Sequence, residues 1–109
     1  MIDLRAKPFY LNDEQAEWVQ TTLNSMSQDD KIKQLFIDMA APVPADVVKG
    51  LVRQRKYGGL RYMNKDGATI SALLKSYKAA SEIPLIIAAN TVAGGNGACS
   101  DGTEIGCET

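Results

Sequence analysis

A chain of 109 residues has the size of one small domain, far below the ~250 residues of a typical α/β barrel. With 45% apolar and 23% charged residues, the composition is that of a globular protein and argues against disorder. Twelve basic and thirteen acidic residues give a net charge of −1, so the chain has no basic field that would gather a nucleic acid.

Membrane proteins, secreted proteins and metal proteins are also disfavoured. The longest apolar run, residues 84–89, is far too short to cross a bilayer. Residues 1–15 carry acids where a signal peptide needs an apolar stretch, so we expect a cytoplasmic protein. Without any histidine, Cys99 and Cys107 cannot form the usual zinc sites, and we expect no metal and no cofactor. Two free thiols are the favoured interpretation, with a local disulfide as the alternative.

The N-terminal part of the chain predicts two helices and a strand. Asn12 precedes a segment with apolar residues at helical spacing, which indicates a capped amphipathic helix. Its apolar stripe consists of Ala16, Val19, Leu23 and Met26. Ser27 with Asp30 three positions later resembles a capping box that begins a second helix. This helix gives way near Gln34 to a short apolar strand, residues 35–39.

Two further helix–strand units follow. After a loop marked by Pro42 and Pro44, residues 45–57 predict a helix that is ended by Gly58 and Gly59. Its expected apolar stripe consists of Val47, Val48, Leu51 and Val52. The glycine pair begins a brief strand, residues 58–64.

Asp66 then caps the last predicted helix, and Pro84 opens the last strand. The helix, residues 67–81, has one apolar face made of Ile70, Leu73, Leu74 and Tyr77. The strand, residues 85–89, is apolar at every position, as expected when both faces of a sheet are covered.

The alternation of helices and strands predicts an α/β domain over residues 1–109, with right-handed crossovers and a parallel sheet. Three parallel strands leave two sheet edges unpaired, and unpaired edges promote association with other chains. We therefore expect the chain to be a fragment of a larger domain and to self-associate.

The glycine-rich loop after the last strand does not fit a nucleotide-binding motif. Starting at Gly95, the dinucleotide fingerprint finds Gly97 but then Ser100 in place of its third glycine, and no P-loop lysine follows. The glycines either permit a tight turn with positive φ or let a ligand approach the backbone. Asn90 stands at the carboxyl end of the strand, where ligands gather in α/β proteins, and its amide can bond hydroxyl groups. A sugar is the expected ligand.

Three segments in order resemble glycoside hydrolase family 3. "IPLIIAAN…AGGNGACSDGT" is similar to the third-strand segment of that family, "SMSQDDKIKQLFI" to its opening helix and first strand, and "KYGGLRYM" to its second strand. The resemblance implies that the chain forms the first three β/α units of a (β/α)8 TIM-type barrel, incomplete in this chain. It also implies hydrolysis of β-linked sugars with retention of configuration, and the segment is more similar to the N-acetylhexosaminidase branch than to the β-glucosidase branch.

The resemblance carries over one site residue and no catalytic residue. Asn90 matches a strand-end residue, often aspartate, that hydrogen-bonds sugar hydroxyls; an amide keeps the bond but loses its charge. The family's nucleophile and acid/base lie downstream of this segment, and a chain without histidine cannot supply a histidine–aspartate pair. Val92 and Ala93 stand where relatives commonly have a glutamate before the glycines. We therefore expect the chain alone to be inactive.

The other candidate residues have ordinary structural explanations. Asp101 and Glu104 are interpreted as solvated acids on a glycine-rich loop. Arg61 and Tyr62 could line the pocket, and they fit equally well a surface arginine and a packed tyrosine. Trp18 is expected to pack. The alternative functions are a non-catalytic domain that binds a carbohydrate or a protein, and a nucleotide-binding α/β domain.

Overall fold

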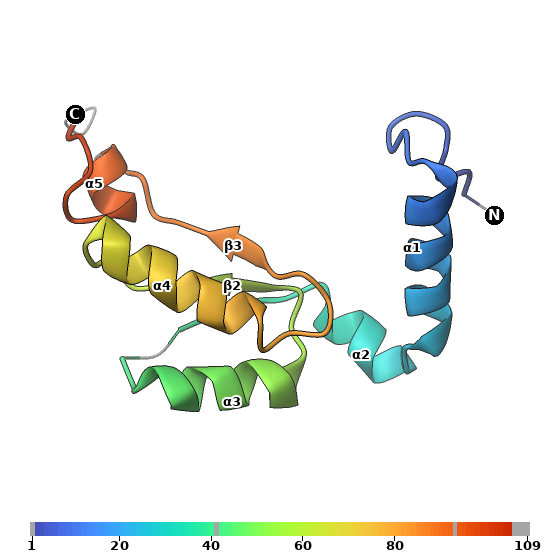
Figure 1. The fold of residues 1–109 in the computed structure, drawn as a ribbon, viewed down its shortest axis with the longest axis horizontal. Helices are drawn as coiled ribbons and strands as arrows, with labels where there is room; N and C mark the ends of the chain where they lie inside the picture. Colours follow the sequence, from blue (N-terminus) through green and yellow to red (C-terminus); the bar gives the residue numbers. More distant parts are fainter. Residues whose placement is uncertain (1, 41, 93, 106–109) are drawn as a thin grey trace. The chain divides into compact units, whose positions relative to one another are not determined.

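The computed structural model describes residues 2–40, 42–92 and 94–105, and its elements are shown in Figure 1. The chain divides into two compact units, Met1–Lys31 and Ile32–Thr109, each with contacts of its own. Among the described residues, no helix combines the length and the apolar content that crossing a membrane requires.

The first unit is built around helix α1 (Asp13–Ser25), which begins at the predicted cap. The side chain of Asn12 accepts a hydrogen bond from the Gln15 main-chain amide at 2.9 Å. In return, the Gln15 side chain accepts one from the Asn12 amide at 3.0 Å, which completes a reciprocal capping box. Ala16 is buried, whereas Trp18 is 50% exposed, so the expected packing of Trp18 is not found.

Helix α2 (Gln28–Lys33) begins at Ser27, whose hydroxyl accepts a hydrogen bond from the Asp30 amide at 3.1 Å, as predicted. Strand β1 (Ile37–Met39) starts two residues later than expected. The reason is local: the amides of Leu35 and Phe36 still donate to carbonyls of α2, at 3.0 and 3.1 Å. The backbone therefore keeps turning until residue 36.

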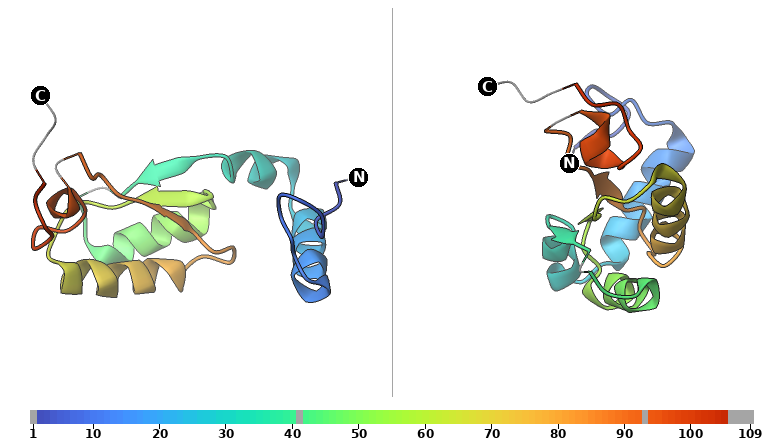
Figure 2. Two further views of the ribbon diagram at one scale, coloured as in Figure 1. Left: turned by 90° about the horizontal axis from the view of Figure 1, so that it is seen from above. Right: turned by 90° about the vertical axis from the view of Figure 1, so that its left-hand side faces the viewer.

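Three parallel strands form the sheet of the second unit, in the order β1–β2–β3. They are β1, β2 (Gly59–Arg61) and β3 (Ile86–Ala88), which confirms the predicted parallel sheet. Helix α3 (Ala45–Arg55) connects β1 to β2, and α4 (Gly67–Lys78) connects β2 to β3. Both helices lie on the same side of the sheet (Figures 1 and 2).

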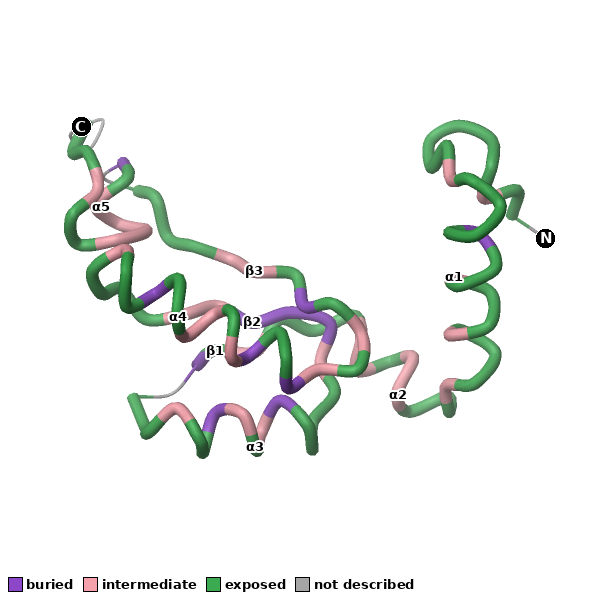
Figure 3. Tube along the Cα trace, viewed as in Figure 1, coloured by how far each residue is buried: buried purple, intermediate pink, exposed green. Residues whose placement is uncertain are grey.

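The strand register determines which side chains face the helices. Leu60 of β2 is aligned with Asp38 and Ile87, and this row points toward α3 and α4. Leu60 is 4% exposed and packs in the core with residues of both helices and of the approach to β3. Figure 3 shows the buried positions on β2 and along the facing sides of both helices. The buried cluster consists of Ala40, Val48, Val52, Leu60, Tyr77, Ala80 and Leu85.

The opposite side of the sheet, here named the uncovered face, consists of two further rows. Ile37, Gly59 and Ile86 form one row, and Met39, Arg61 and Ala88 form the other. The large apolar side chains on it are 53–65% exposed: Ile37 54%, Met39 53% and Ile86 65%. The prediction that both faces of β3 are covered is therefore wrong for this chain, because helices cover only one face.

Helix α3 departs from the sequence prediction at two points. Val48 and Val52 are buried, but the neighbouring Val47 is 48% exposed, so it does not belong to the buried stripe. The helix ends at Arg55 rather than at the glycine pair, because Lys56 adopts the left-handed conformation with φ of 53°. Gly58 is needed instead for close approach, since a Cβ there would collide with the carbonyl oxygen of Gln34.

Helix α4 is capped as predicted by Asp66, whose carboxylate accepts a hydrogen bond from the Thr69 amide at 2.8 Å. The predicted face is confirmed: Ile70 and Tyr77 are buried, and Leu73 and Leu74 pack against the core. Hydrogen bonds from Thr69, first from its side chain and then from its amide, lower the pKa of the Asp66 carboxyl below its ordinary value.

Adjacent residues at β3 provide a matched test of the one-sided core. We expect Leu85→Ala to cost about 2–5 kcal/mol of unfolding free energy, because it empties a buried site. Ile86→Ala should cost less than about 1 kcal/mol, because Ile86 is exposed on the uncovered face and only strand propensity changes. Urea unfolding of both variants measures the difference, and equal costs would contradict a core on one side only.

The cap of α4 predicts an acid-dependent contribution to stability. A carboxyl whose pKa is lowered by folding stabilises the fold above its unfolded pKa of about 3.9, and this contribution is lost as the pH falls through the folded pKa. Asp66→Asn keeps a capping oxygen without the charge, so its urea midpoint should fall less than that of the wild type between about pH 5 and pH 2. Asp29→Asn on α2 is the control, and equal acid sensitivity of Asp66→Asn and wild type would contradict the prediction.

Candidate functional site

The candidate site lies at the edge of the sheet formed by the carboxyl ends of the parallel strands. Strand β3 ends at Ala88, and Asn90 follows two residues later with an exposed side chain. Its Oδ1 accepts a hydrogen bond from the Val92 amide at 3.1 Å, an Asx turn that fixes the carboxamide. Among the described residues the Nδ2 of Asn90 has no acceptor. The side chain therefore presents two N–H donors from a held position.

The loop after Asn90 folds back on itself. Gly94 has a φ of 98°, which confirms a glycine turn with positive φ. Gly94 forms an antiparallel bridge with Glu104, and the Asn96 amide donates to the Thr103 carbonyl at 3.2 Å. Between these contacts lies α5 (Gly95–Ala98), a single helical turn where the sequence indicated only a loop. Its four residues are too few to show a helical apolar pattern, which explains why it was missed.

Gly97 brings this turn against Asn90. A Cβ built on Gly97 would lie 2.5 Å from the main-chain oxygen of Asn90, so only glycine permits the approach. The absence of a side chain on Gly97 thus serves close packing within the chain, and the approach of a ligand to these glycines stays a prediction. What approaches here is another part of the same loop.

The loop after β2 holds the loop after β3 through contacts that we name the loop clamp, between residues 64–67 and 96–101. The Nδ2 of Asn64 donates to the carbonyls of Asn96 and Gly97, at 2.5 and 3.2 Å. The Ser100 amide donates to the Lys65 carbonyl at 2.8 Å. Figure 1 shows α5 beside the start of α4, where these contacts lie.

Asp101 completes the clamp and is not simply a solvated acid. Its Oδ1 accepts a hydrogen bond from the Gly67 amide at 2.9 Å, at the first residue of α4. An aspartate at this place accepts a hydrogen bond from an amide that the helix leaves unpaired. Its negative charge also interacts favourably with the positive end of the helix dipole. Glu104 remains exposed, in agreement with its expected solvation. The described residues contain no cluster of three or more His, Cys, Asp or Glu side chains suited to a metal.

The clamp depends mainly on backbone groups of the loop it holds. The side-chain Oδ1 of Asn96 is buried and has no donor among the described residues. A buried oxygen without a hydrogen bond lowers the free energy of unfolding by about 1–3 kcal/mol, so this oxygen does not stabilise the loop. What Asn96 contributes to the clamp is its main-chain carbonyl.

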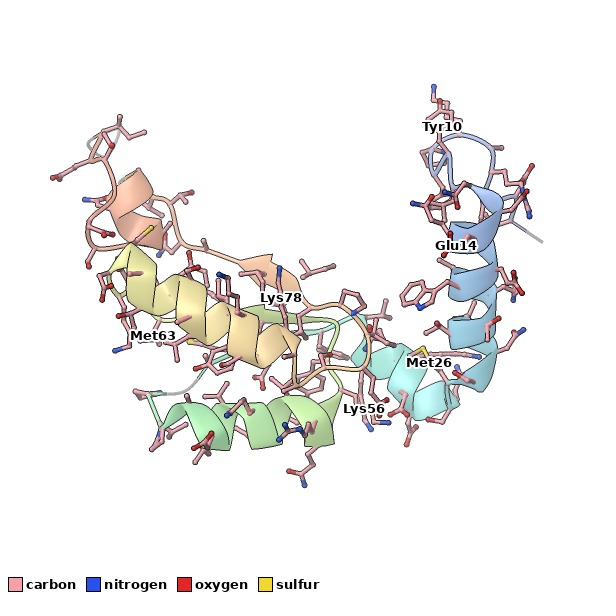
Figure 4. The ribbon with its side chains drawn as sticks, viewed as in Figure 1. Tyr10, Glu14, Met26, Lys56, Met63 and Lys78 are labelled. Carbon is pink, nitrogen blue, oxygen red and sulfur yellow. The ribbon has the colours of Figure 1, made fainter. Side chains whose placement is uncertain are left out.

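Arg61 and Tyr62 point to opposite sides of the sheet. Arg61 ends β2 on the uncovered face, half-buried, and is aligned with Ala88 just before Asn90. Tyr62 lines a hollow between the start of α3 and the length of α4, together with Met63 and Tyr77, in keeping with a packed tyrosine (Figure 4 labels Met63). Arg61 is thus in register with the last residue of β3, whereas Tyr62 shares its hollow with Asn64 and Lys65 of the loop clamp.

The remaining sequence candidates contribute little to the site. Val92 is 75% exposed and offers only an apolar side chain. Ala93 and Cys107 lie outside the described residues. Cys99 has a free thiol and is half-buried.

Asn64 was not singled out by sequence reasoning, although a signal was present. It follows the end of β2 by three residues, much as Asn90 follows β3. Residues that directly follow parallel strands lie at the same edge of the sheet, so Asn64 is expected on the same edge as Asn90. The carbonyls that it bonds are 32 and 33 residues away in sequence, and a local sequence pattern cannot predict such a long-range contact.

Known proteins similar to this chain act on glycosides. No family model matches the chain. It is 32% identical over 106 residues to a Cellulomonas fimi protein named beta-N-acetylglucosaminidase/beta-glucosidase, covering 97% of this chain and 19% of that protein. It is also similar to a structure of beta-glucoside phosphorylase BglX bound to 2FGlc, with a TM-score of 0.76 and 32% identity over 94% of this chain and 19% of the other. A second structure of that phosphorylase gives a TM-score of 0.71, with 34% identity over 94% of this chain and 18% of the other.

The chain thus spans about a fifth of the length of these relatives, and the match runs over nearly all of its own residues. The resemblance stated from the three sequence segments is confirmed: the chain is related to the N-terminal domain of glycoside hydrolase family 3.

Proposed function

We propose that this chain forms the first three β/α units of a (β/α)8 barrel in a retaining β-glycosidase. The observation that carries the proposal is the winding of the sheet: each strand lies beside the previous one and both crossover helices lie on one face. A barrel winds in this way, whereas a doubly wound sheet carries helices on both faces. The similarity to the glycosidase and the phosphorylase supports the same conclusion.

The uncovered face fits the interior of such a barrel. Ile37, Met39 and Ile86 are large apolar side chains without cover in this unit. Barrel interiors are filled by layers of branched apolar side chains from alternate strands. In the proposed barrel, strands from outside this chain would bury these residues.

The proposed substrate is a terminal β-linked sugar, with N-acetylhexosaminides favoured over β-glucosides. The name of the Cellulomonas fimi relative includes both activities. Asn90 would donate from Nδ2 to a sugar hydroxyl oxygen, because its Oδ1 is already held by the Val92 amide. An amide makes a neutral hydrogen bond, weaker than the charge-assisted bond that a carboxylate would make.

Hydrolysis with retention needs two groups about 5 Å apart, one nucleophile and one acid/base. Asp101 is bonded to the start of α4, and the chain has no histidine. We therefore propose that the chain binds sugar and that residues outside it carry out the chemistry. A stand-alone carbohydrate- or protein-binding domain is the alternative, and such a domain needs no catalytic pair.

Sugar binding is tested by isothermal titration of the chain with N-acetylglucosamine. One or two neutral hydrogen bonds predict a Kd of about 1 mM or weaker. Asn90→Ala removes the donors and should weaken binding severalfold, and no p-nitrophenol should be released from the p-nitrophenyl β-glycoside of N-acetylglucosamine.

Asn24→Ala on α1 is the matched control, since it removes an exposed carboxamide far along the sequence from the loop. Binding of nucleotides without any response to the sugar would contradict the sugar proposal. Hydrolysis by the chain alone would contradict the assignment of catalysis to residues outside it.

The uncovered face and the two unpaired sheet edges also predict self-association of the chain. Sedimentation velocity over a concentration series should show oligomers, and Ile86→Ser should reduce them by removing an apolar side chain from the uncovered face. Val92→Ser is the control, because Val92 is 75% exposed but lies on the loop. A wild-type monomer at every concentration would contradict this prediction.

A further inference from the structure

We propose that Asn64 is a positioning residue, which sets the orientation of Asn90 through Gly97. The proposal rests on the proposed function, in which Asn90 donates to the sugar. It adds a residue that touches no sugar itself and acts through the loop after β3.

The first step is the grip of Asn64 on the loop. One nitrogen, Nδ2, donates to two consecutive carbonyls, those of Asn96 and Gly97. A carboxamide nitrogen carries two N–H groups, so it can satisfy both carbonyls at once. A carboxylate of the same shape has no donor and would place an oxygen against two carbonyl oxygens.

The second step is the contact between Gly97 and Asn90. The space for a side chain on Gly97 is taken by the Asn90 carbonyl oxygen, 2.5 Å from the ideal Cβ position. The peptide after Asn90 therefore lies directly against the residue that Asn64 holds. If residues 96 and 97 move, that peptide loses the surface on which it rests.

The third step leads to the donor itself. The Asx turn joins Asn90 Oδ1 to the Val92 amide, and its geometry depends on the backbone between these two residues. A shift of the peptide after Asn90 breaks this bond and frees the carboxamide to rotate. Sugar binding would then have to order the Asn90 side chain, and the lost conformational entropy lowers the affinity.

The test uses the full chain with Asn64→Asp, which keeps the side-chain shape and removes the donors. Because two hydrogen bonds are lost, amide hydrogen exchange at Val92, measured by NMR without sugar, should become about tenfold faster. For the same reason, the Kd for N-acetylglucosamine should rise about tenfold. Gln34→Glu is the matched control: it also removes a bond from a side-chain amide to a main-chain carbonyl, that of Gln34 Nε2 to Lys56 at 2.8 Å, but at the amino ends of β1 and β2 and outside the loop clamp. It should lower stability while leaving Val92 exchange and sugar affinity at the wild-type values.

The two measurements separate this inference from the proposed function. Unchanged exchange at Val92 in Asn64→Asp overturns the positioning role, whatever the sugar does. Faster exchange with unchanged affinity overturns it as well, since the turn would then be irrelevant to the ligand. A wild-type chain that does not respond to N-acetylglucosamine overturns the proposed function, and Val92 exchange still decides whether Asn64 holds Asn90. An equal loss of affinity in Gln34→Glu would reduce Asn64 to a stabilising residue and so overturn the inference.

Discussion

The handedness of the two crossovers is the constraint on which the rest of this structure depends. Two connections of the same hand, from β1 to β2 and onward in the same direction from β2 to β3, require α3 and α4 to lie on one face, and a right hand is the rule for parallel strands. Leu60 on the central strand is then buried beneath both helices. The same constraint leaves Ile37, Met39 and Ile86 exposed on the other face. Core and uncovered face are thus two results of one connection rule.

The site follows from the same rule, because parallel strands bring all of their carboxyl ends to one edge. The loop after β2 and the loop after β3 become neighbours there, although they are far apart in sequence. Asn64, Ser100 and Asp101 use this proximity to join the loops through hydrogen bonds. These contacts are exposed, so each contributes a modest free energy, and together they give the loop one shape.

The features that were predictable from sequence are those encoded within a few residues. Asn12 and Asp66 accept hydrogen bonds from amides three positions ahead, and both caps were predicted from the residue type and its place before an apolar helical pattern. The parallel sheet followed from the spacing of apolar runs. Lys56 could not be predicted in its left-handed conformation, since non-glycine residues seldom adopt it. Nor could the exposure of Ile86, because an apolar sequence indicates a preference for burial and does not say whether a partner is present.

The site was predictable to the same extent. Asn90 was predicted as a site residue because it follows a strongly apolar strand, and this stays a prediction, whereas the glycine turn is confirmed by the positive φ of Gly94. Asp101 is exposed as expected, but its hydrogen bond was not predicted, since its partner Gly67 is 34 residues away. Whether an acid on a glycine-rich loop is free or bonded depends on the tertiary fold, and composition cannot distinguish the two.

The loop clamp has a consequence for how this site can change during evolution. It holds the loop by main-chain groups of Asn96, Gly97 and Ser100, whose side chains are not required for these bonds. Substitutions at Asn96 and Ser100 can therefore alter the chemistry of the loop without altering its path. The positions that require a particular residue are instead Asn64, Asp101 and the glycines. Such a division lets new ligand preferences arise by single mutations, while the scaffold that presents them stays the same.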